Sequence, residues 1–86
     1  MKQVIDVPEY DPVVGLRVEW EFDFHIATRV DDQGVIVITA NSPGLISLAR
    51  HLLLLAQPSV PKGHHLHLDV FNSLEEGSRD IIVERG

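Results

Sequence analysis

Apolar and charged residues alternate over residues 16–27, which predicts a long β-strand with one buried and one solvated face. We expect Trp20 to be a core residue, because a large aromatic side chain in the inward row packs there. The inward row consists of Leu16, Val18, Trp20, Phe22, Phe24 and Ile26.

Asp31 to Gly34 have the composition of a tight turn, in which Gly34 can take a positive φ. Val35 to Thr39 would then return as the second strand of a hairpin. This segment is apolar on both faces, which indicates a central strand. Its outer face is either covered by other residues or left as an exposed apolar strip.

A helix is predicted over residues 42–57, capped by Asn41 or Ser42 and followed by Pro58. Placing its residues at 100° intervals gives one apolar stripe toward the sheet. The opposite face is polar except for Leu54, a candidate anchor for an interface. The stripe is Leu45, Leu48, Ala49, Leu52 and Ala56, flanked by Leu53 and Leu55, and the outward residues are Ser47, Arg50, His51 and Leu54.

The C-terminal part predicts two more strands, one over residues 64–70 with Leu66 and Leu68 inward and one over residues 79–84. The loop between them, "FNSLEEGS", places Gly77 in a left-handed conformation.

The order β-β-α-β-β predicts an α+β fold. We expect a mainly antiparallel sheet of four strands, or five if an edge strand forms around Gln3 to Val7, with one helix packed on one face. The chain is expected to form one domain over residues 1–86. Its parts are an irregular lead or edge strand (1–15), a hairpin (16–39), a helix (42–57) and two C-terminal strands (64–86).

Composition narrows the classes of function. The chain of 86 residues has a net charge of −6, no cluster of Lys and Arg, and no cysteine. These properties argue against nucleic acid binding, disulfides and thiolate zinc sites, and they suit a basic partner protein. The first residues lack the apolar core of a signal peptide, and no apolar run is long enough to span a membrane. We therefore expect a cytoplasmic protein.

The stretch "GHHLHLD" contains the most reactive chemistry of the chain. His65, His67 and Asp69 alternate with Leu66 and Leu68, so they would share the face of a strand that points away from the helix. Two imidazoles and a carboxylate form a plausible site for zinc or iron. The same residues also suit an ordinary solvent-exposed face.

Two hydrolase families resemble this stretch in part. "HLHLDVF" is similar to the motif of the histidine-triad nucleotide hydrolases, with His67 as the nucleophile and His65 as its companion, but Asp69 replaces the third histidine. It is also similar to the His-x-His-x-Asp-His signature of metallo-β-lactamase-like hydrolases, where Val70 replaces the last histidine. Each motif lacks a residue that it requires.

A third resemblance covers residues 38–86. The helix opening on Asn-x-x-Gly-Leu, the His-x-His-Leu-Asp strand and the Leu-Glu-x-Gly-Ser turn resemble the immunity protein 32 family of bacterial polymorphic-toxin immunity proteins. The matching positions are Asn41, Gly44, Leu45, His65, His67, Leu68, Asp69, Leu74, Glu75, Gly77 and Ser78. The resemblance implies a protein made beside a toxin, which neutralises that toxin by binding it. It implies no catalytic residues.

The favoured function is therefore non-enzymatic neutralisation of a cognate toxin, with no cofactor required. The partner-binding candidates are the acidic residues Glu19, Glu21, Asp23, Glu75 and Glu76. Two alternatives stay open: a small metal-dependent or phosphoryl-transfer hydrolase using His65, His67 and Asp69, with zinc as its metal, and a structural or regulatory homodimer.

Overall fold

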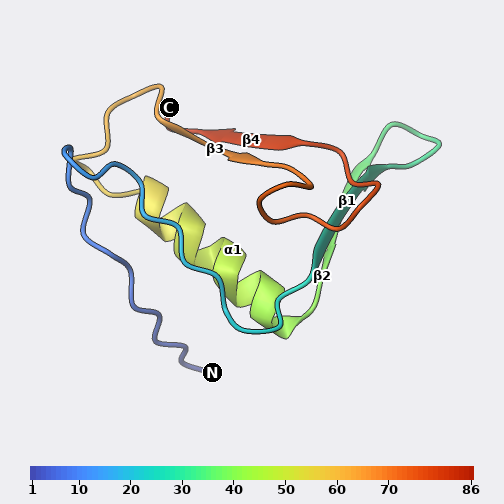
Figure 1. Cartoon of the computed structure of the whole chain (residues 1–86), viewed down its shortest axis with the longest axis horizontal. Coiled ribbons are helices and arrows are strands. Elements are labelled where there is room, and N and C mark those ends of the chain that lie inside the picture. The colour runs from blue at the N-terminus through green and yellow to red at the C-terminus, as the bar shows by residue number, and fades with distance from the viewer.

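The computed structural model describes all 86 residues and confirms the α+β class and the order β-β-α-β-β. Figure 1 shows one helix crossed by extended chain, with two pairs of strands beside it. The elements are β1 (Ile26–Val30), β2 (Ile36–Ala40), α1 (Ser42–Leu55), β3 (His65–Leu68) and β4 (Ile81–Glu84). No strand forms around residues 3–7.

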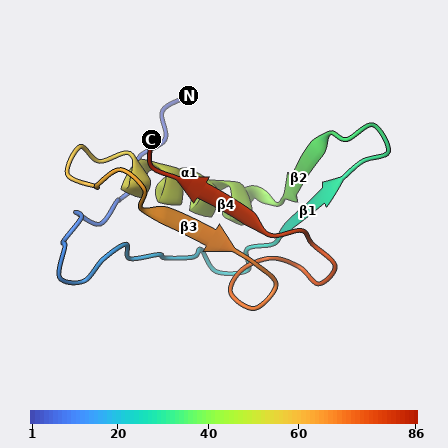
Figure 2. The same ribbon diagram turned by 90° about the horizontal axis from the view of Figure 1, so that it is seen from above.

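The four strands form two antiparallel pairs, β1–β2 and β3–β4, so the expected single sheet is not confirmed. Figure 2 shows the β1–β2 hairpin projecting past the end of α1, away from the β3–β4 pair. The loop before β4 lies along the edge of β1 that faces away from β2, where another strand would pair in a larger sheet. The Glu75 amide donates to the Ile26 carbonyl at 2.8 Å, and the Arg79 amide donates to the Thr28 carbonyl at 3.3 Å.

The segment from residue 16 to residue 25 forms no strand, although its alternation predicts one, and the chain turns at residues 22 and 23. Its backbone is bonded to side chains of α1 instead of to another strand. The Glu21 amide donates to Ser47 Oγ at 2.8 Å. Two residues earlier, the backbone of Glu19 lies against His51, whose Nε2 is 2.9 Å from the Glu19 carbonyl oxygen.

The same arrangement continues at both ends of the helix. At its start, Asn41 Oδ1 accepts from the His25 amide at 3.0 Å, and Asn41 Nδ2 donates to the Asp23 carbonyl at 2.9 Å. At its end, Gln57 Oε1 accepts from the Tyr10 amide at 2.9 Å, while Gln57 Nε2 donates to the Pro8 carbonyl at 2.8 Å. Polar side chains in α1 and just beyond its two ends thus bond the backbone at residues 8, 10, 19, 21, 23 and 25.

This arrangement rotates the helix away from the predicted face. The buried residues of α1 are Gly44, Ser47, His51, Leu54 and Leu55. Leu54 is only 1 % exposed, so its assignment as an outward interface anchor is wrong. Leu45, Leu52 and Leu53, which we expected on or beside the buried stripe, are exposed. The cause is chemical: Ser47 and His51 must turn inward to reach the backbone that they bond.

The core consists of two small clusters rather than one large one. Tyr10, Leu55, Val60 and Leu66 form the first, and Ile26, Leu68 and Leu74 form the second. The inward direction of Leu66 and Leu68 is confirmed. Trp20 is half-buried against the second cluster, where its ring stacks on Phe24 at 4.6 Å and meets His51 edge-on at 4.2 Å. Phe22 is 93 % exposed, because the chain turns at Phe22 and Asp23 and leaves the alternation there.

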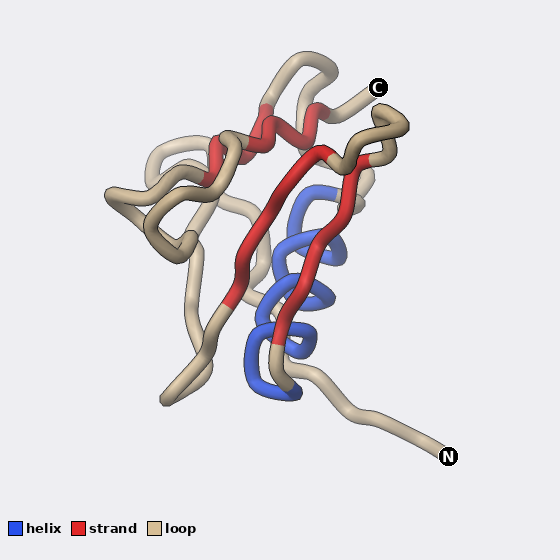
Figure 3. The backbone as a smooth tube through the Cα atoms, turned by 90° about the vertical axis from the view of Figure 1, so that its right-hand side faces the viewer, coloured by secondary structure: helices blue, strands red, loops and turns tan.

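β2 has β1 on one side only, as Figure 3 shows, so its expected place in the centre of a sheet is wrong. The apolar strip is exposed, and Ile36 is 71 % accessible to solvent. The turn between the strands forms as expected, with Gly34 at φ 80°. No helix of the protein combines the length and the apolar character that are needed to cross a membrane.

Burial also changes the chemistry of His51. Its side chain is 1 % exposed, and its Nδ1 is buried without a hydrogen-bond partner. Removal from water lowers the pKa of His51 below 6.5, against the smaller opposing effect of the bond to the Glu19 backbone. His51 is therefore neutral near pH 7. Its Nε2 donates to the Glu19 carbonyl oxygen at 2.9 Å or accepts from the Glu19 amide at 3.1 Å, according to which ring nitrogen carries the proton.

Asn41→Ala should destabilise the protein by about 2 kcal/mol, whereas Ser42→Ala should change its stability by less than about 0.5 kcal/mol. Asn41 is the N-cap, accepting from the Gly44 amide at 2.9 Å, and it also bonds the backbone of residues 23 and 25. Ser42 is exposed and makes no side-chain hydrogen bond. Urea unfolding followed by tryptophan fluorescence measures both. Equal losses in the two variants would contradict this account of the cap.

Candidate functional site

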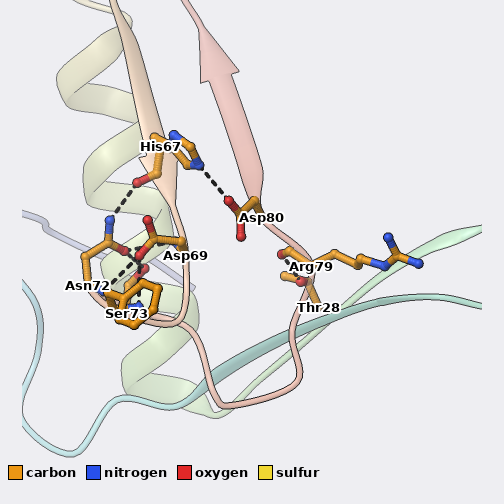
Figure 4. A network of polar contacts seen from close by, with 8 residues as sticks. Thr28, His67, Asp69, Asn72, Ser73, Arg79 and Asp80 are labelled. Atoms are coloured by element: carbon orange, nitrogen blue, oxygen red, sulfur yellow. Dashed lines mark hydrogen bonds and ion pairs between the residues drawn. The ribbon is translucent and has the colours of Figure 1, made fainter.

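The outer side of the β3–β4 pair brings together one histidine and two aspartates. His67, Asp69 and Asp80 each offer one ligand atom, and these atoms all lie within 4.8 Å of one another. Figure 4 shows His67 on β3 facing Asp80 just before β4, with Asp69 at the end of β3. His67 Nε2 lies 2.9 Å from Asp80 Oδ2. This group could hold a divalent cation.

His65 does not belong to this group. Its Nδ1 lies 3.4 Å from the Gly63 carbonyl oxygen, and it stands opposite Glu84 in the register of β3 and β4. The predicted set of His65, His67 and Asp69 therefore exchanges His65 for Asp80. Sequence reasoning missed Asp80 because it precedes the partner strand, and only the β3–β4 register places it beside His67.

Two of the three side chains already make hydrogen bonds within the protein. Asp69 Oδ1 accepts from the amides of Phe71 and Asn72 at 2.9 and 3.1 Å, which closes the turn after β3. His67 is paired with Asp80. A metal would have to compete with these bonds for Asp69 Oδ1 and His67 Nε2. Both His67 and Asp80 are also exposed to water, which weakens their use as a desolvated catalytic pair.

A second group of charges lies where the N-terminal segment meets the loop before β4. His25 Nδ1 is 2.5 Å from Glu75 Oε1, and His25 Nε2 is 3.3 Å from Asp23 Oδ1. We call these three residues the His25 cluster. Glu75 is the main cause that raises the pKa of His25 above 6.5, and Asp23 adds to the effect. Asp23 and Glu75, two of the predicted partner-binding residues, thus both contact His25.

The other predicted partner-binding residues are not part of this cluster. Glu21 is paired with the largely buried Arg50 at 2.8 Å, so much of its charge is neutralised within the protein. Glu19 and Glu76 are exposed and make no side-chain contact of this kind. Asp23, Glu75, Glu19 and Glu76 thus remain on the surface of the protein.

The sequence of the chain was also compared with known proteins. A sequence model of the family described as immunity protein 32 matches residues 35–86. The chain belongs to this family. No curated protein and no solved structure gave a significant match. The resemblance drawn from the helix opening, the histidine strand and the Leu-Glu-x-Gly-Ser turn is thereby confirmed.

The residues that marked the family have structural roles in this fold. Asn41 caps α1, and Asp69 closes the turn after β3. Gly44 lies so close to β1 that an added Cβ would stand 2.5 Å from the His25 carbonyl oxygen. Gly77 has φ 86°, as expected, and Ser78 Oγ accepts from the Thr28 amide at 3.0 Å. These five positions of the family pattern therefore serve the fold. Asp69, together with His67 of the same pattern, also belongs to the group that could hold a cation.

Glu75→Gln should lower the pKa of His25 toward 6.5, whereas Glu76→Gln should leave it almost unchanged, since Glu76 makes no contact with the imidazole. Because the pKa in the native protein is raised, His25 keeps its proton at a pH where an unfolded chain would lose it. The stabilisation by this pair is therefore complete below about pH 6.5 and is lost as the pH rises through the native pKa. An NMR titration of the imidazole protons measures both variants. Equal pKa shifts would show that Glu75 has no special effect.

Proposed function

We propose that this chain is an immunity protein that binds a cognate toxin in the cytoplasm and blocks it by occlusion. The match to the immunity protein 32 family over residues 35–86 is the observation that carries the proposal. Binding requires only a complementary surface, and the chain is acidic, with a net charge of −6. A basic toxin surface would be attracted to it over distances of about 10 Å at moderate salt.

The acidic residues that remain on the surface support this mode of association. Glu19, Asp23, Glu75 and Glu76 would speed the encounter with a basic partner. Glu21 contributes less, because Arg50 neutralises it. Protonation of His25 would remove one unit of negative charge from its cluster, so association should slow as the pH falls through the pKa of His25.

Neutralising Glu19, Asp23, Glu75 and Glu76 together, with Gln and Asn, should slow association with the toxin by about 10-fold at low salt. The probe is the toxin domain encoded beside the gene for this chain, and stopped-flow fluorescence gives the rate constants. The effect should shrink as salt is raised, since screening removes long-range attraction. Dissociation should change much less.

The matched control neutralises four other acidic residues, so the change in net charge is the same. Asp6, Glu9, Asp32 and Glu84 serve, because all four are exposed and their carboxylates make no ion pair. If the control slows association as strongly as the test variant, net charge rather than this surface steers the toxin. If the unmodified protein does not bind the toxin domain at all, the proposed function is wrong.

The hydrolase alternative is kept because His67, Asp69 and Asp80 are close enough to share a cation. Since His67 Nε2, Asp80 Oδ2 and Asp69 Oδ1 already bond within the protein, we expect far less than one zinc per chain after purification without a histidine tag. Elemental analysis measures this. One zinc per chain, retained in His65→Ala but lost in Asp80→Asn, would favour the metal-dependent hydrolase over the immunity protein.

A further inference from the structure

β2 carries an unused hydrogen-bonding edge. The Asn41 amide donates to the His25 carbonyl at 3.1 Å, and the Asp31 amide donates to the Val35 carbonyl at 2.9 Å. In an antiparallel pair such bonds recur at alternate residues, so the backbone of Val37 and Thr39 also faces β1. The amides and carbonyls of Ile36 and Ile38 point the other way, where no strand is present.

The side chains of these two residues lie on an apolar face. Ile36 and Ile38 stand opposite Val30 and Thr28 in the register, and all four line a groove of about 280 Å³ between the hairpin and β4. Ile82 lines the same groove from β4 and is 58 % exposed. The face begins in the core with Ile26 and Thr28 and is exposed at Val30, Ile36 and Ile38.

Neither charged residues nor proline protect this edge from pairing with another strand. Residues 35–40, "VIVITA", contain no charged residue and no proline, the usual devices that keep an edge strand from pairing. The charged residues that line the groove are Arg29, Arg79 and Asp80. Asp80 is paired with His67, whereas neither arginine makes an ion pair within the protein, so the unpaired charge at the groove is positive. Figure 4 shows the Arg79 side chain extending away from the His67–Asp80 pair.

We propose that the toxin adds an extended segment to the free edge of β2. This inference rests on the proposed function and specifies how the complex forms. The segment hydrogen-bonds the backbone of Ile36 and Ile38, places apolar side chains at alternate positions into the groove, and brings a carboxylate to Arg79. A second copy of the chain fits less well, because each copy has a net charge of −6 and two copies repel each other.

Ile38→Pro tests the backbone contact directly. The Ile38 amide faces the free edge, so proline there removes no bond to β1 but blocks the added strand. Ile38→Glu tests the groove, and Thr39→Glu is its matched control, with the same charge on the opposite face of the same strand. The probe is again the toxin domain encoded beside the gene, and calorimetry gives the Kd. We expect Ile38→Pro and Ile38→Glu to weaken binding about 10-fold or more, and Thr39→Glu to weaken it less than about 3-fold.

Hydrogen exchange on the unmodified protein gives a second measurement that does not depend on the folding of any variant. The Ile36 and Ile38 amides should exchange rapidly in the free protein and become protected in the complex. The Val37 and Thr39 amides should be protected in both.

The outcomes separate this inference from the proposed function. If the toxin binds but neither Ile38 variant nor the exchange of Ile36 and Ile38 responds, the edge is not the contact, while the proposed function stands. If the unmodified protein does not bind the toxin domain, both fail. If light scattering shows a dimer that Ile38→Pro dissociates, the occupant of the edge is a second copy, and the proposal of a toxin strand is wrong.

Discussion

The bonds between the polar side chains of α1 and the backbone of the N-terminal segment are the constraint on which the rest of the fold depends. An extended segment that has no neighbouring strand leaves its amides and carbonyls without partners, and each such group costs about 1–3 kcal/mol when it is buried. Ser47 and His51 in α1, and Asn41 and Gln57 just beyond its ends, bond six backbone positions of this segment. The helix must then turn the side that makes these bonds inward, which buries Leu54 and exposes Leu45 and Leu52. One set of polar contacts thus decides both the path of the chain and the orientation of the helix.

This constraint also explains which features could be predicted from the sequence. The local signals were reliable: the turn at Gly34, the cap at Asn41 and the inward direction of Leu66 and Leu68 all appear in the structure. Alternation over residues 16–25 indicates an extended chain but does not reveal what it pairs with, so the segment was predicted as a strand. The predicted apolar face of the helix is wrong because a helical projection places every polar residue toward solvent. Ser47 and His51 are buried for their hydrogen bonds, and no periodicity of apolar residues reports that. Asp80 was missed because its nearness to His67 depends on the register of β3 and β4.

The family resemblance and the contact surface carry different information. Several residues that mark the family have structural roles. Asn41 caps a helix, and Gly44 allows the chain to approach closely. Asp69 and Gly77 form turns. Such positions stay recognisable because the backbone geometry admits few other residues. Residues that contact a toxin have no such backbone constraint, since they must instead match one partner. The structural positions of the pattern can therefore place a chain in a family without marking a binding surface, whereas Glu75 belongs both to the pattern and to the surface proposed to bind.

The two surfaces that we propose for toxin binding are joined through β1. The amide of Glu75, which belongs to the His25 cluster, donates to the Ile26 carbonyl, and the amide of Arg79 donates to the Thr28 carbonyl. The Thr28 hydroxyl also donates to the Arg79 carbonyl. The loop that carries both Glu75 and Arg79 is thus bonded along the edge of β1 opposite to β2. The acidic residues proposed to attract a partner and the free edge proposed to hold an extended segment are therefore held on one small framework. Long-range attraction and short-range pairing can then act in sequence on the same toxin, because the first brings a basic surface near and the second requires a direct backbone fit.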